Sequence, residues 1–356
     1  MTRSGSLRVA LLAPPWLPVP PGGYGGIELV VYLLARELHA RGHEVTIFAR
    51  QGSSAELDVV ALAPGSWKEH LGSRDERARE CLHVYRAYEV VRRRAFDVVH
   101  DHTGFTGMTV GAALRLAAPV VATLHGDLTE ADGELLGALE QRVALVAITA
   151  SQQNQVAGVG WSGVVHNAVD AEEFHVSDEK DDYLLQLARI TPDKGQHLAI
   201  EVARRLGRPL VLAGKVDPAG QTYFREQIEP QLGEDVRWIE DVQGEDKARL
   251  LARARAMLFP IQWEEPFGLA MVEAMASGTP VVAMRNGAAP ELIEEGETGF
   301  LGDDVDDLVE GVRRSEEIDP GRCAGHARER FSPTRMADGY EDVYRRAIER
   351  RSQMSG

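Results

Sequence analysis

Short apolar runs alternate with amphipathic stretches along most of the chain. Runs rich in β-branched residues predict buried strands of a parallel sheet, and apolar residues spaced every three or four positions predict helices. In the N-terminal half we expect a helix over 27–40 and strands over 7–13, 45–49, 96–100, 120–124 and 143–148. A polar and acidic stretch, 167–182, then interrupts the pattern as an interdomain linker would.

The same alternation starts again after the acidic stretch. It predicts helices over 196–206, 219–232, 246–254 and 268–277, and strands over 183–188, 209–213, 236–239, 256–259 and 280–283. Strands that alternate with helices indicate parallel βαβ units. We therefore predict an α/β fold of two Rossmann-like parallel-sheet domains that face a cleft, since ligands bind beyond the carboxyl ends of such strands.

Composition agrees with a folded two-domain protein and narrows its function. The 356 residues are 44% hydrophobic and 26% charged, as in globular proteins. The formal net charge of −16 argues against a nucleic-acid partner, which needs a broad basic face. Two separate cysteines, Cys81 and Cys323, form neither a disulfide framework nor a zinc site and indicate a reducing compartment. With no signal peptide and no membrane-spanning run, we expect a cytoplasmic protein, either free or peripherally bound to a membrane.

The first chemical motif runs from Glu265 to Val282, where a loop leads into a helix. Gly268 allows a close approach of the backbone to a ligand as the helix begins, and the free N–H groups of a helix start favour phosphate. Glu265 and Glu273, about two turns apart, would accept hydrogen bonds from the hydroxyls of a sugar and a ribose. The alternative is an ordinary helix whose N-terminal acidic residue favours the dipole.

The second motif, Leu187 to Gly195, joins a strand to a helix start. Thr191 and Pro192 suit the N-cap and the first helical position. Arg189 and Lys194 would then clamp a diphosphate, with no need of a metal for the positive charge. The alternative is a pair of solvated surface cations.

Two weaker signals lie in the N-terminal half. The glycine-rich loop that contains Gly25 and Gly26 is not a G-x-G-x-x-G, which disfavours a dehydrogenase, but it still allows a ligand to approach the backbone. His125 at a strand end would reach hydroxyls or phosphate. We expect the side chains of His100 and His102 to point to opposite sides of a strand end and therefore to bind no metal. The alternatives are a loop without a ligand and a histidine that only closes a strand.

The two C-terminal motifs resemble those of a known family. The segment from Glu265 to Val282 closely resembles the E-x7-E signature of retaining glycosyltransferases of family 4, which have the GT-B fold. The segment from Leu187 to Gly195 resembles that family's G-R-x-x-x-x-K-G element, with Ala188 in place of glycine. The resemblance extends from about residue 7 to residue 344. It is loose over 52–94, which is the part expected to hold the acceptor.

The resemblance implies a role for each candidate residue. Glu265 would bind donor-sugar hydroxyls, Glu273 the ribose, and Arg189 with Lys194 the diphosphate. The backbone of Phe267, Gly268 and Leu269 would face the donor. In the N-terminal half, Gly25 and Gly26 would reach the donor phosphates, and His125 would lie near the donor sugar and the acceptor. The catalytic set is His125, Arg189, Lys194 and Glu265.

The implied activity is retaining transfer of a sugar from a UDP-, GDP- or dTDP-linked donor to a small-molecule, lipid or glycan acceptor, without a further cofactor. The implied organisation is an acceptor domain over 1–172, a donor domain over 173–332, and a terminal helix over 333–356 that packs back on the first domain. Two alternatives stay open: a sugar-nucleotide epimerase or hydrolase on the same fold, and a sugar-nucleotide binder without catalysis.

Overall fold

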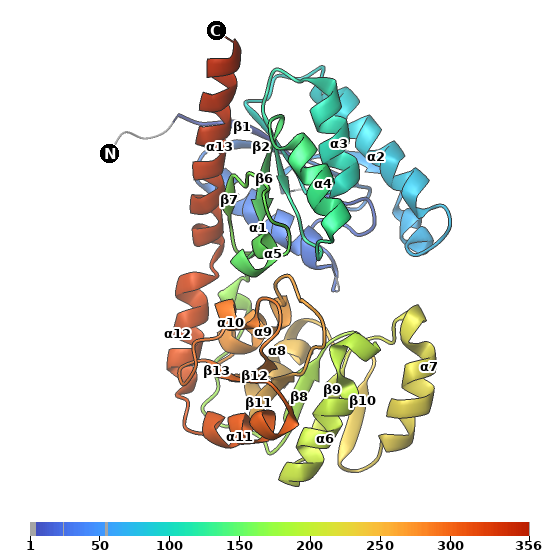
Figure 1. Ribbon diagram of the computed structural model, residues 1–356, viewed down its shortest axis with the longest axis vertical. Coiled ribbons are helices and arrows are strands. Elements are labelled where there is room, and N and C mark those ends of the chain that lie inside the picture. The colour runs from blue at the N-terminus through green and yellow to red at the C-terminus, as the bar shows by residue number, and fades with distance from the viewer. Residues whose placement is uncertain (1–4, 24, 54–55, 356) are drawn as a thin grey trace. The chain divides into compact units, whose positions relative to one another are not determined.

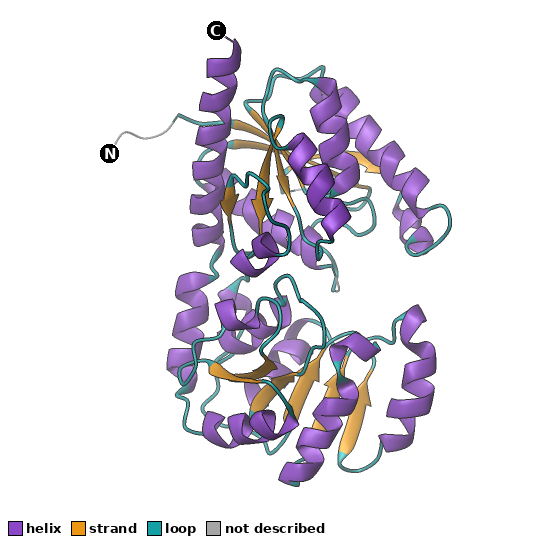
Figure 2. Cartoon of the chain, in the orientation of Figure 1, coloured by secondary structure: helices purple, strands orange, loops and turns teal. Residues whose placement is uncertain are grey.

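The computed structural model describes residues 5–23, 25–53 and 56–355. The chain divides into two compact units, one of Met1–Ala168 together with Pro333–Gly356 and one of Val169–Ser332. We call them the N-terminal unit and the C-terminal unit. Each contains one parallel sheet with helices on both faces (Figures 1 and 2).

The sheet of the N-terminal unit has seven parallel strands in the order β3-β2-β1-β4-β5-β6-β7. Their bounds are β1 Arg8–Leu12, β2 Glu44–Arg50, β3 Asp58–Ala63, β4 Val98–Asp101, β5 Val120–Thr123, β6 Val143–Ala147 and β7 Gly163–Val164. The order reverses direction between β1 and β4, which are paired in parallel. Such a switch point is where open α/β sheets bind ligands.

The helices of this unit bury one face each against the sheet. They are α1 Gly26–Ala40, α2 Glu76–Val91, α3 Phe105–Leu114, α4 Glu130–Leu139, α5 Ala150–Asn154 and α13 Pro333–Ser355, with a 3₁₀ turn, η1, at Gly65–His70. The apolar spacing of α1 places Val30, Leu34 and Leu38 fully inside, as an amphipathic helix requires. A core of α2, α3 and the central strands surrounds the buried Tyr88 and Met108.

The C-terminal unit repeats the pattern with six parallel strands in the order β10-β9-β8-β11-β12-β13. The strands are β8 Leu184–Leu187, β9 Leu210–Ala213, β10 Val236–Ile239, β11 Ala256–Phe259, β12 Val281–Met284 and β13 Gly299–Gly302. The helices are α6 Gln196–Leu206, α7 Gln221–Tyr223, α8 Gly244–Arg253, α9 Leu269–Ala276, α10 Ala289–Leu292, α11 Val305–Ser315 and α12 Pro320–Arg330. Here the switch point lies between β8 and β11, which also pair in parallel.

The predicted fold class, two Rossmann-like parallel-sheet domains, is confirmed. One predicted helix differs, since the stretch 219–232 forms a short α7, a π-helical turn at Phe224–Ile228 and a 3₁₀ turn at Glu229–Gln231. Pro230 lacks an N–H and clashes with the preceding turn, so a regular helix cannot run through it.

The acidic stretch expected as a linker is held firmly against the C-terminal unit. The Lys180 ammonium donates to the carbonyls of Ala252 and Gly278 at 2.8 and 3.0 Å and to the hydroxyl of Thr279 at 2.9 Å. Burial lowers the pKa of Lys180 to about 8. The stretch is therefore an ordered edge of this unit, which begins at Val169.

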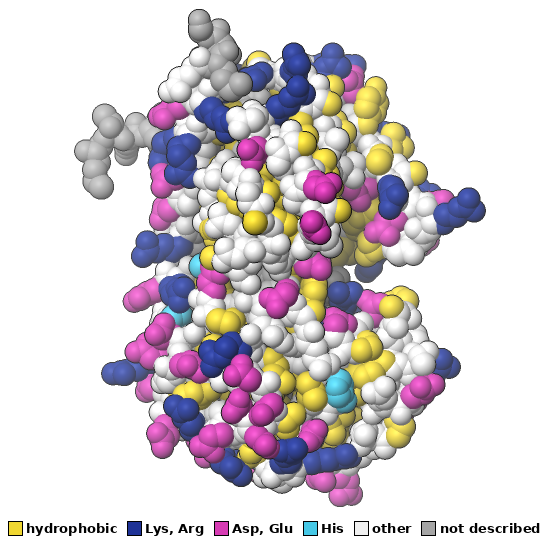
Figure 3. Space-filling model, in the orientation of Figure 1, with side chains coloured by type: hydrophobic (Ala, Val, Ile, Leu, Met, Phe, Trp, Pro, Cys, Tyr) yellow, Lys and Arg dark blue, Asp and Glu magenta, His cyan; other side chains and the backbone are white. Residues whose placement is uncertain are grey.

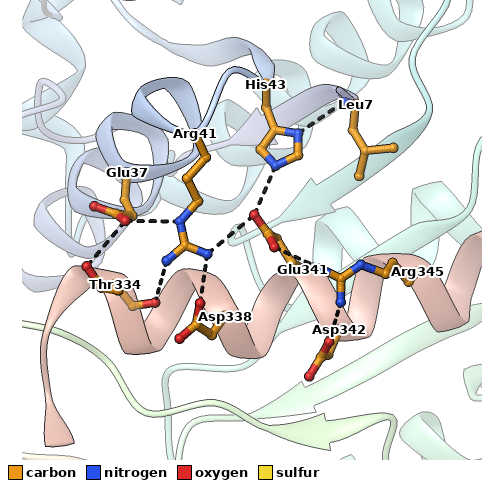
Figure 4. Close-up of polar contacts among 9 residues, drawn as sticks. All are labelled: Leu7, Glu37, Arg41, His43, Thr334, Asp338, Glu341, Asp342 and Arg345. Atoms are coloured by element: carbon orange, nitrogen blue, oxygen red, sulfur yellow. Dashed lines mark hydrogen bonds and ion pairs between the residues drawn. The ribbon is translucent and has the colours of Figure 1, made fainter. Parts of the chain in front are cut away.

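Helix α13 is bonded to α1 within the N-terminal unit (Figure 4). Arg41, just after α1, donates to Glu37 at 3.0 Å, to Asp338 at 2.8 Å and to the carbonyl of Thr334 at 2.9 Å. His43 lies 3.0 Å from Glu341. Burial acts to raise the pKa of Glu341, but the contacts with His43 and Arg41 outweigh it and lower that pKa.

Candidate active site

The two motifs of the C-terminal unit occupy the loops that follow β8 and β11. These strands are neighbours at the switch point, so the loops emerge side by side at the carboxyl edge of the sheet. The loop after β8 carries Arg189 and Lys194, and the loop after β11 carries Glu265. The sequence pattern therefore brings residues more than 70 positions apart into one place.

Lys194 and Glu265 form the centre of this arrangement. The Lys194 ammonium lies 2.6 Å from Oε2 of Glu265, and the two side chains are only 10% and 15% exposed. The same ammonium lies 4.6 Å above the ring of Trp263, a favourable position for a cation over an aromatic face. The structure thus joins the cation of one motif to the carboxylate of the other.

Two buried glutamines hold the Arg189–Lys194 loop by its backbone. Gln186 donates to the carbonyl of Lys194 at 2.6 Å, and Gln196 donates to that of Arg189 at 2.9 Å. The Arg189 side chain is exposed and lies 2.5 Å from Asp217. Lys194 is consequently fixed in a buried contact, whereas Arg189 lies at the surface with a carboxylate partner that the sequence did not reveal.

The start of α9 has the features expected of an anion site. Gly268 adopts a left-handed φ of 84° at the N-cap, and no side chain within the described ranges caps this end. Phe267 is buried, and Leu269 is the first helical residue. The first N–H groups of an uncapped helix are free to bind a phosphate. Gly287 packs tightly on the loop, since a Cβ there would lie 2.4 Å from both N and O of Glu265.

Glu273 lies inside α9 and is buried. Its Oε1 lies 2.6 Å from the ammonium of Lys247 on α8. Sequence reasoning missed Lys247, because it belongs to an unremarkable amphipathic helix 26 positions away. An acidic residue in the interior of a helix next to a glycine-rich turn is the signal that would have prompted a search for such a partner.

In the N-terminal unit, the candidate residues follow β1 and β5. Gly25, with φ 151°, precedes α1, and Gly26 is its first residue; Tyr24 between the glycine pairs lies outside the described residues. His125 follows β5, and its Nε2 lies 2.9 Å from Nδ1 of His102, which follows β4. Burial lowers the pKa of His125 to about 4, so the ring is neutral at neutral pH.

The expectation that His100 and His102 point to opposite sides is wrong. Their ring centroids are 4.0 Å apart, because residues i and i+2 of a strand share a face. His100 is bonded instead to the hydroxyls of Tyr344 and Thr123, at 2.7 and 2.8 Å. Within the described ranges, no group of three or more His, Cys, Asp or Glu side chains is arranged to hold a metal ion.

Two family models together match most of the chain. Residues 24–173 match Glycosyltransferase Family 4, and residues 170–332 match Glycosyl transferases group 1. A D-inositol 3-phosphate glycosyltransferase of Mycobacterium marinum is 30% identical over 96% of this chain and 86% of its own length.

The chain belongs to the family 4 glycosyltransferases.

Other relatives agree with this assignment. The D-inositol 3-phosphate glycosyltransferase of Streptomyces avermitilis is 28% identical over 96% of this chain and 88% of its own length. Among solved structures, a glycosyltransferase involved in avilamycin A biosynthesis is 28% identical, with a TM-score of 0.76 over 96% of this chain and 98% of that chain. Sucrose-phosphate synthase of Thermosynechococcus elongatus, 18% identical, has a TM-score of 0.79 over 96% and 99% of the two chains, which shows the fold.

This family 4 glycosyltransferase therefore has the GT-B fold. No helix within the described residues is long and apolar enough to cross a membrane. The epimerase and binding-protein alternatives gain no support from the matched families or from the relatives named above. The contact between Lys194 and Glu265 joins the two motifs that first indicated the family.

Proposed function

We propose that this enzyme transfers a sugar from a nucleotide-diphosphate sugar to an acceptor hydroxyl with retention at the anomeric carbon. The observation that carries the proposal is the 2.6 Å contact of Lys194 with Glu265. A sugar diphosphate presents hydroxyls and phosphate a few ångströms apart. An adjacent carboxylate and ammonium match that chemistry, one for each part.

Each group of the site has a role in the proposed reaction. Lys194, Arg189 and the free N–H groups of α9 stabilise the negative charge that grows on the departing diphosphate. Glu265 binds the sugar hydroxyls and orients the anomeric carbon. Glu273, held by Lys247, accepts a hydrogen bond from the ribose. The backbones of Phe267, Gly268 and Leu269 line the donor.

The bond changes balance without a protein nucleophile. The bond from the anomeric carbon to the diphosphate oxygen breaks, and the acceptor oxygen bonds to that carbon on the same face. The proton of the acceptor hydroxyl passes to the departing diphosphate. Gly25 and Gly26 approach the donor phosphates, and the neutral ring of His125 contacts the donor sugar or the acceptor.

Buried polar atoms in the loops that carry Lys194 and Glu265 support the presence of a ligand there. The hydroxyl of Thr191 and the indole N–H of Trp263 are buried donors without a hydrogen-bond partner in the described part of the chain. Buried donors are rarely left unpaired in native proteins. Both belong to the loops that carry Lys194 and Glu265, so a phosphate or hydroxyl oxygen would satisfy them.

A thermal-shift panel tests the donor. UDP, GDP and dTDP and their sugars are compared, and the true base gives the largest stabilisation because a ligand that binds the native state raises stability by mass action. Polyol phosphates are the first acceptors to test, because two of the relatives named above are D-inositol 3-phosphate glycosyltransferases by name. If no nucleotide sugar raises the melting temperature of the protein, the proposal is contradicted.

Lys194→Ala tests the site itself. Loss of this cation should lower kcat by about 10²- to 10³-fold, the usual effect of removing one group that stabilises transition-state charge. The melting temperature should fall only modestly, since Glu265 keeps some access to water. Arg313→Ala, which removes an exposed cation of α11, is the control. Normal turnover by Lys194→Ala would exclude the assigned role.

A further inference from the structure

A pocket of about 300 Å³ opens in the N-terminal unit, at the amino ends of β5 and β6. It lies at the edge of the sheet opposite to the loops that carry His102 and His125, because those loops follow the carboxyl ends of β4 and β5. The end of α3 and the last turns of α13 complete its walls. No residue of the candidate active site lines it.

The pocket combines an apolar floor with a positive rim. The floor includes Ala112, Leu116, Pro119, Val143 and Ala347. The rim carries four arginines, Arg115, Arg142, Arg350 and Arg351, and no Asp or Glu is among the lining residues. Figure 3 shows Lys and Arg side chains gathered around this end of the N-terminal unit. Such a concentration is notable in a chain with a formal net charge of −16.

Three of these arginines, Arg115, Arg142 and Arg350, have no carboxylate partner among the described residues. Within the described residues, no hydrogen bond or ion pair involves the guanidinium of Arg115 or Arg142. Arg350 contacts neutral acceptors, the carbonyl of Glu140 at 3.4 Å and the amide oxygen of Gln141 at 2.5 Å. Their positive charge is therefore uncompensated and directed to the same pocket.

Arg115 also has a strained backbone. It ends α3 in the left-handed conformation, with φ 46° and ψ 53°, and it is the only non-glycine residue with a positive φ among those described. Glycine is the usual residue at this position of a helix end. Strain of this kind persists where the surroundings require a particular side chain, which is common at ligand sites.

We propose that this pocket binds a small phosphate ester, with the phosphate held by Arg115, Arg142 and Arg350 and the organic part resting on the apolar floor. Guanidinium groups pair with phosphate through two parallel hydrogen bonds, which a lysine cannot provide. The volume suits a molecule of modest size. The absence of acidic side chains from the lining leaves no carboxylate for donor hydroxyls, so the site differs in chemistry from the candidate active site.

The test measures binding of glycerol 3-phosphate and inorganic phosphate by calorimetry and thermal shift. Glycerol, the uncharged analogue, is the control ligand. Arg142→Gln should weaken the affinity for glycerol 3-phosphate by about 10- to 100-fold, as the loss of one charge-assisted contact does. Arg115→Gly should weaken it similarly while leaving the melting temperature at or above that of the parent, because glycine relieves the left-handed strain. A structural role for Arg115 would instead lower stability.

Two further variants separate this pocket from other anion sites. The double variant Arg189→Gln/Lys194→Ala removes cations of the candidate active site and should keep the affinity of the parent for glycerol 3-phosphate. Arg328→Gln, at an exposed arginine of α12 outside both sites, should also bind normally. The proposal is overturned if Arg142→Gln binds as the parent does, if binding is lost only in the double variant, or if only vesicles of phosphatidic acid or a polyanion such as DNA bind.

Discussion

His102 and His125 illustrate how two strand ends build one polar contact. Nδ1 of His102 lies 2.9 Å from Nε2 of His125, and the rings are stacked with centroids 5.3 Å apart. Burial lowers the pKa of both rings, so both are neutral and one ring N–H donates to the other ring. His102 is buried and its Nε2 has no hydrogen-bond partner in the described residues. The contact with His102 therefore fixes the orientation of the His125 ring, which is the more accessible of the two.

This contact predicts a positioning role for His102. In His102→Leu, kcat should fall on the order of 10- to 100-fold, since a small misplacement of a reacting group has effects of that size. The KM for the donor should change little, because the donor site that we propose consists of Lys194, Glu265 and the start of α9. His102→Asn, whose amide sits where Nδ1 was, should recover part of the loss. Steady-state kinetics decide: equal losses in both variants, or a rise in KM alone, would contradict the role.

For single residues, the sequence predicted which side chains form the candidate site but not which residues they contact. It singled out Lys194 and Glu265 because each belongs to a motif with a long, specific spacing. It did not reveal Asp217 and Lys247, which bind Arg189 and Glu273. Those partners come from separate elements, and their spacing follows no local period. The opposite-face interpretation of His100 and His102 failed for a simpler reason, since strand side chains repeat every two residues.

Helix α13 is attached to several other elements of its unit. Its Tyr344 hydroxyl contacts His100 at 2.7 Å, and its Tyr340 hydroxyl contacts Thr123 at 3.0 Å. The polar cluster around Arg41 binds the first turns of the helix to α1 (Figure 4). The helix is thus anchored to the end of α1 and to the carboxyl ends of β4 and β5.

The polar contacts of Arg41 predict that their loss weakens the attachment of α13 to α1. Arg41→Met should lower the free energy of unfolding by about 1–3 kcal/mol, since it removes several charged hydrogen bonds from a partly buried position. Arg345→Ala is the matched control, because its pairs with Glu341 and Asp342 lie within the helix and are worth about 0.5 kcal/mol or less. Hydrogen exchange of residues 333–355 should accelerate in the first variant. Equal protection in both would contradict the anchoring role.

Elements with a strong hydrophobic period were predictable, whereas three of the four edge strands, β3, β7 and β13, were not. The helix at 196–206 and the strands at 236–239 and 256–259 have the predicted bounds. Strand β13 was missed because glycines begin and end it, and β3 was missed because it lies at the edge of its sheet with only one of its six residues buried. Their positions depend on pairing with β12 and β2, and a single sequence does not display such pairing.

On the scale of the whole molecule, the two units share a topology but bury different titratable groups. In the described part of the N-terminal unit, burial lowers the pKa of four histidines. Burial lowers the pKa of His83 and His125 to about 4 and that of His100 and His102 well below the ordinary value. In the C-terminal unit, Lys180 has a pKa lowered to about 8, so it stays charged throughout the acid range.

These shifts predict that acid destabilises the N-terminal unit first. A histidine in the unfolded chain gains its proton near pH 6.5, but His83 and His125 gain theirs only near pH 4. The unfolded state therefore binds more protons in that window, and stability falls as pH falls. At pH 5 the loss is about 2 kcal/mol for the fully buried His83. Asp101 opposes this trend, because burial raises its pKa to about 6 and stability from that group rises on acidification through pH 6.

The measurement follows unfolding at pH 7 and pH 5 by calorimetry, with hydrogen exchange to assign each transition. Protection of β4 and β5 should fall before that of β8 and β11 at pH 5. His83→Gln isolates one histidine: its amide can replace the ring N–H that lies 3.0 Å from the carbonyl of Ala13, so stability at pH 7 is nearly kept while the drop between pH 7 and pH 5 shrinks. His39→Gln, at an exposed position of α1, should leave the drop unchanged. Identical pH dependence in the two variants would show that buried neutral histidines do not govern the acid response.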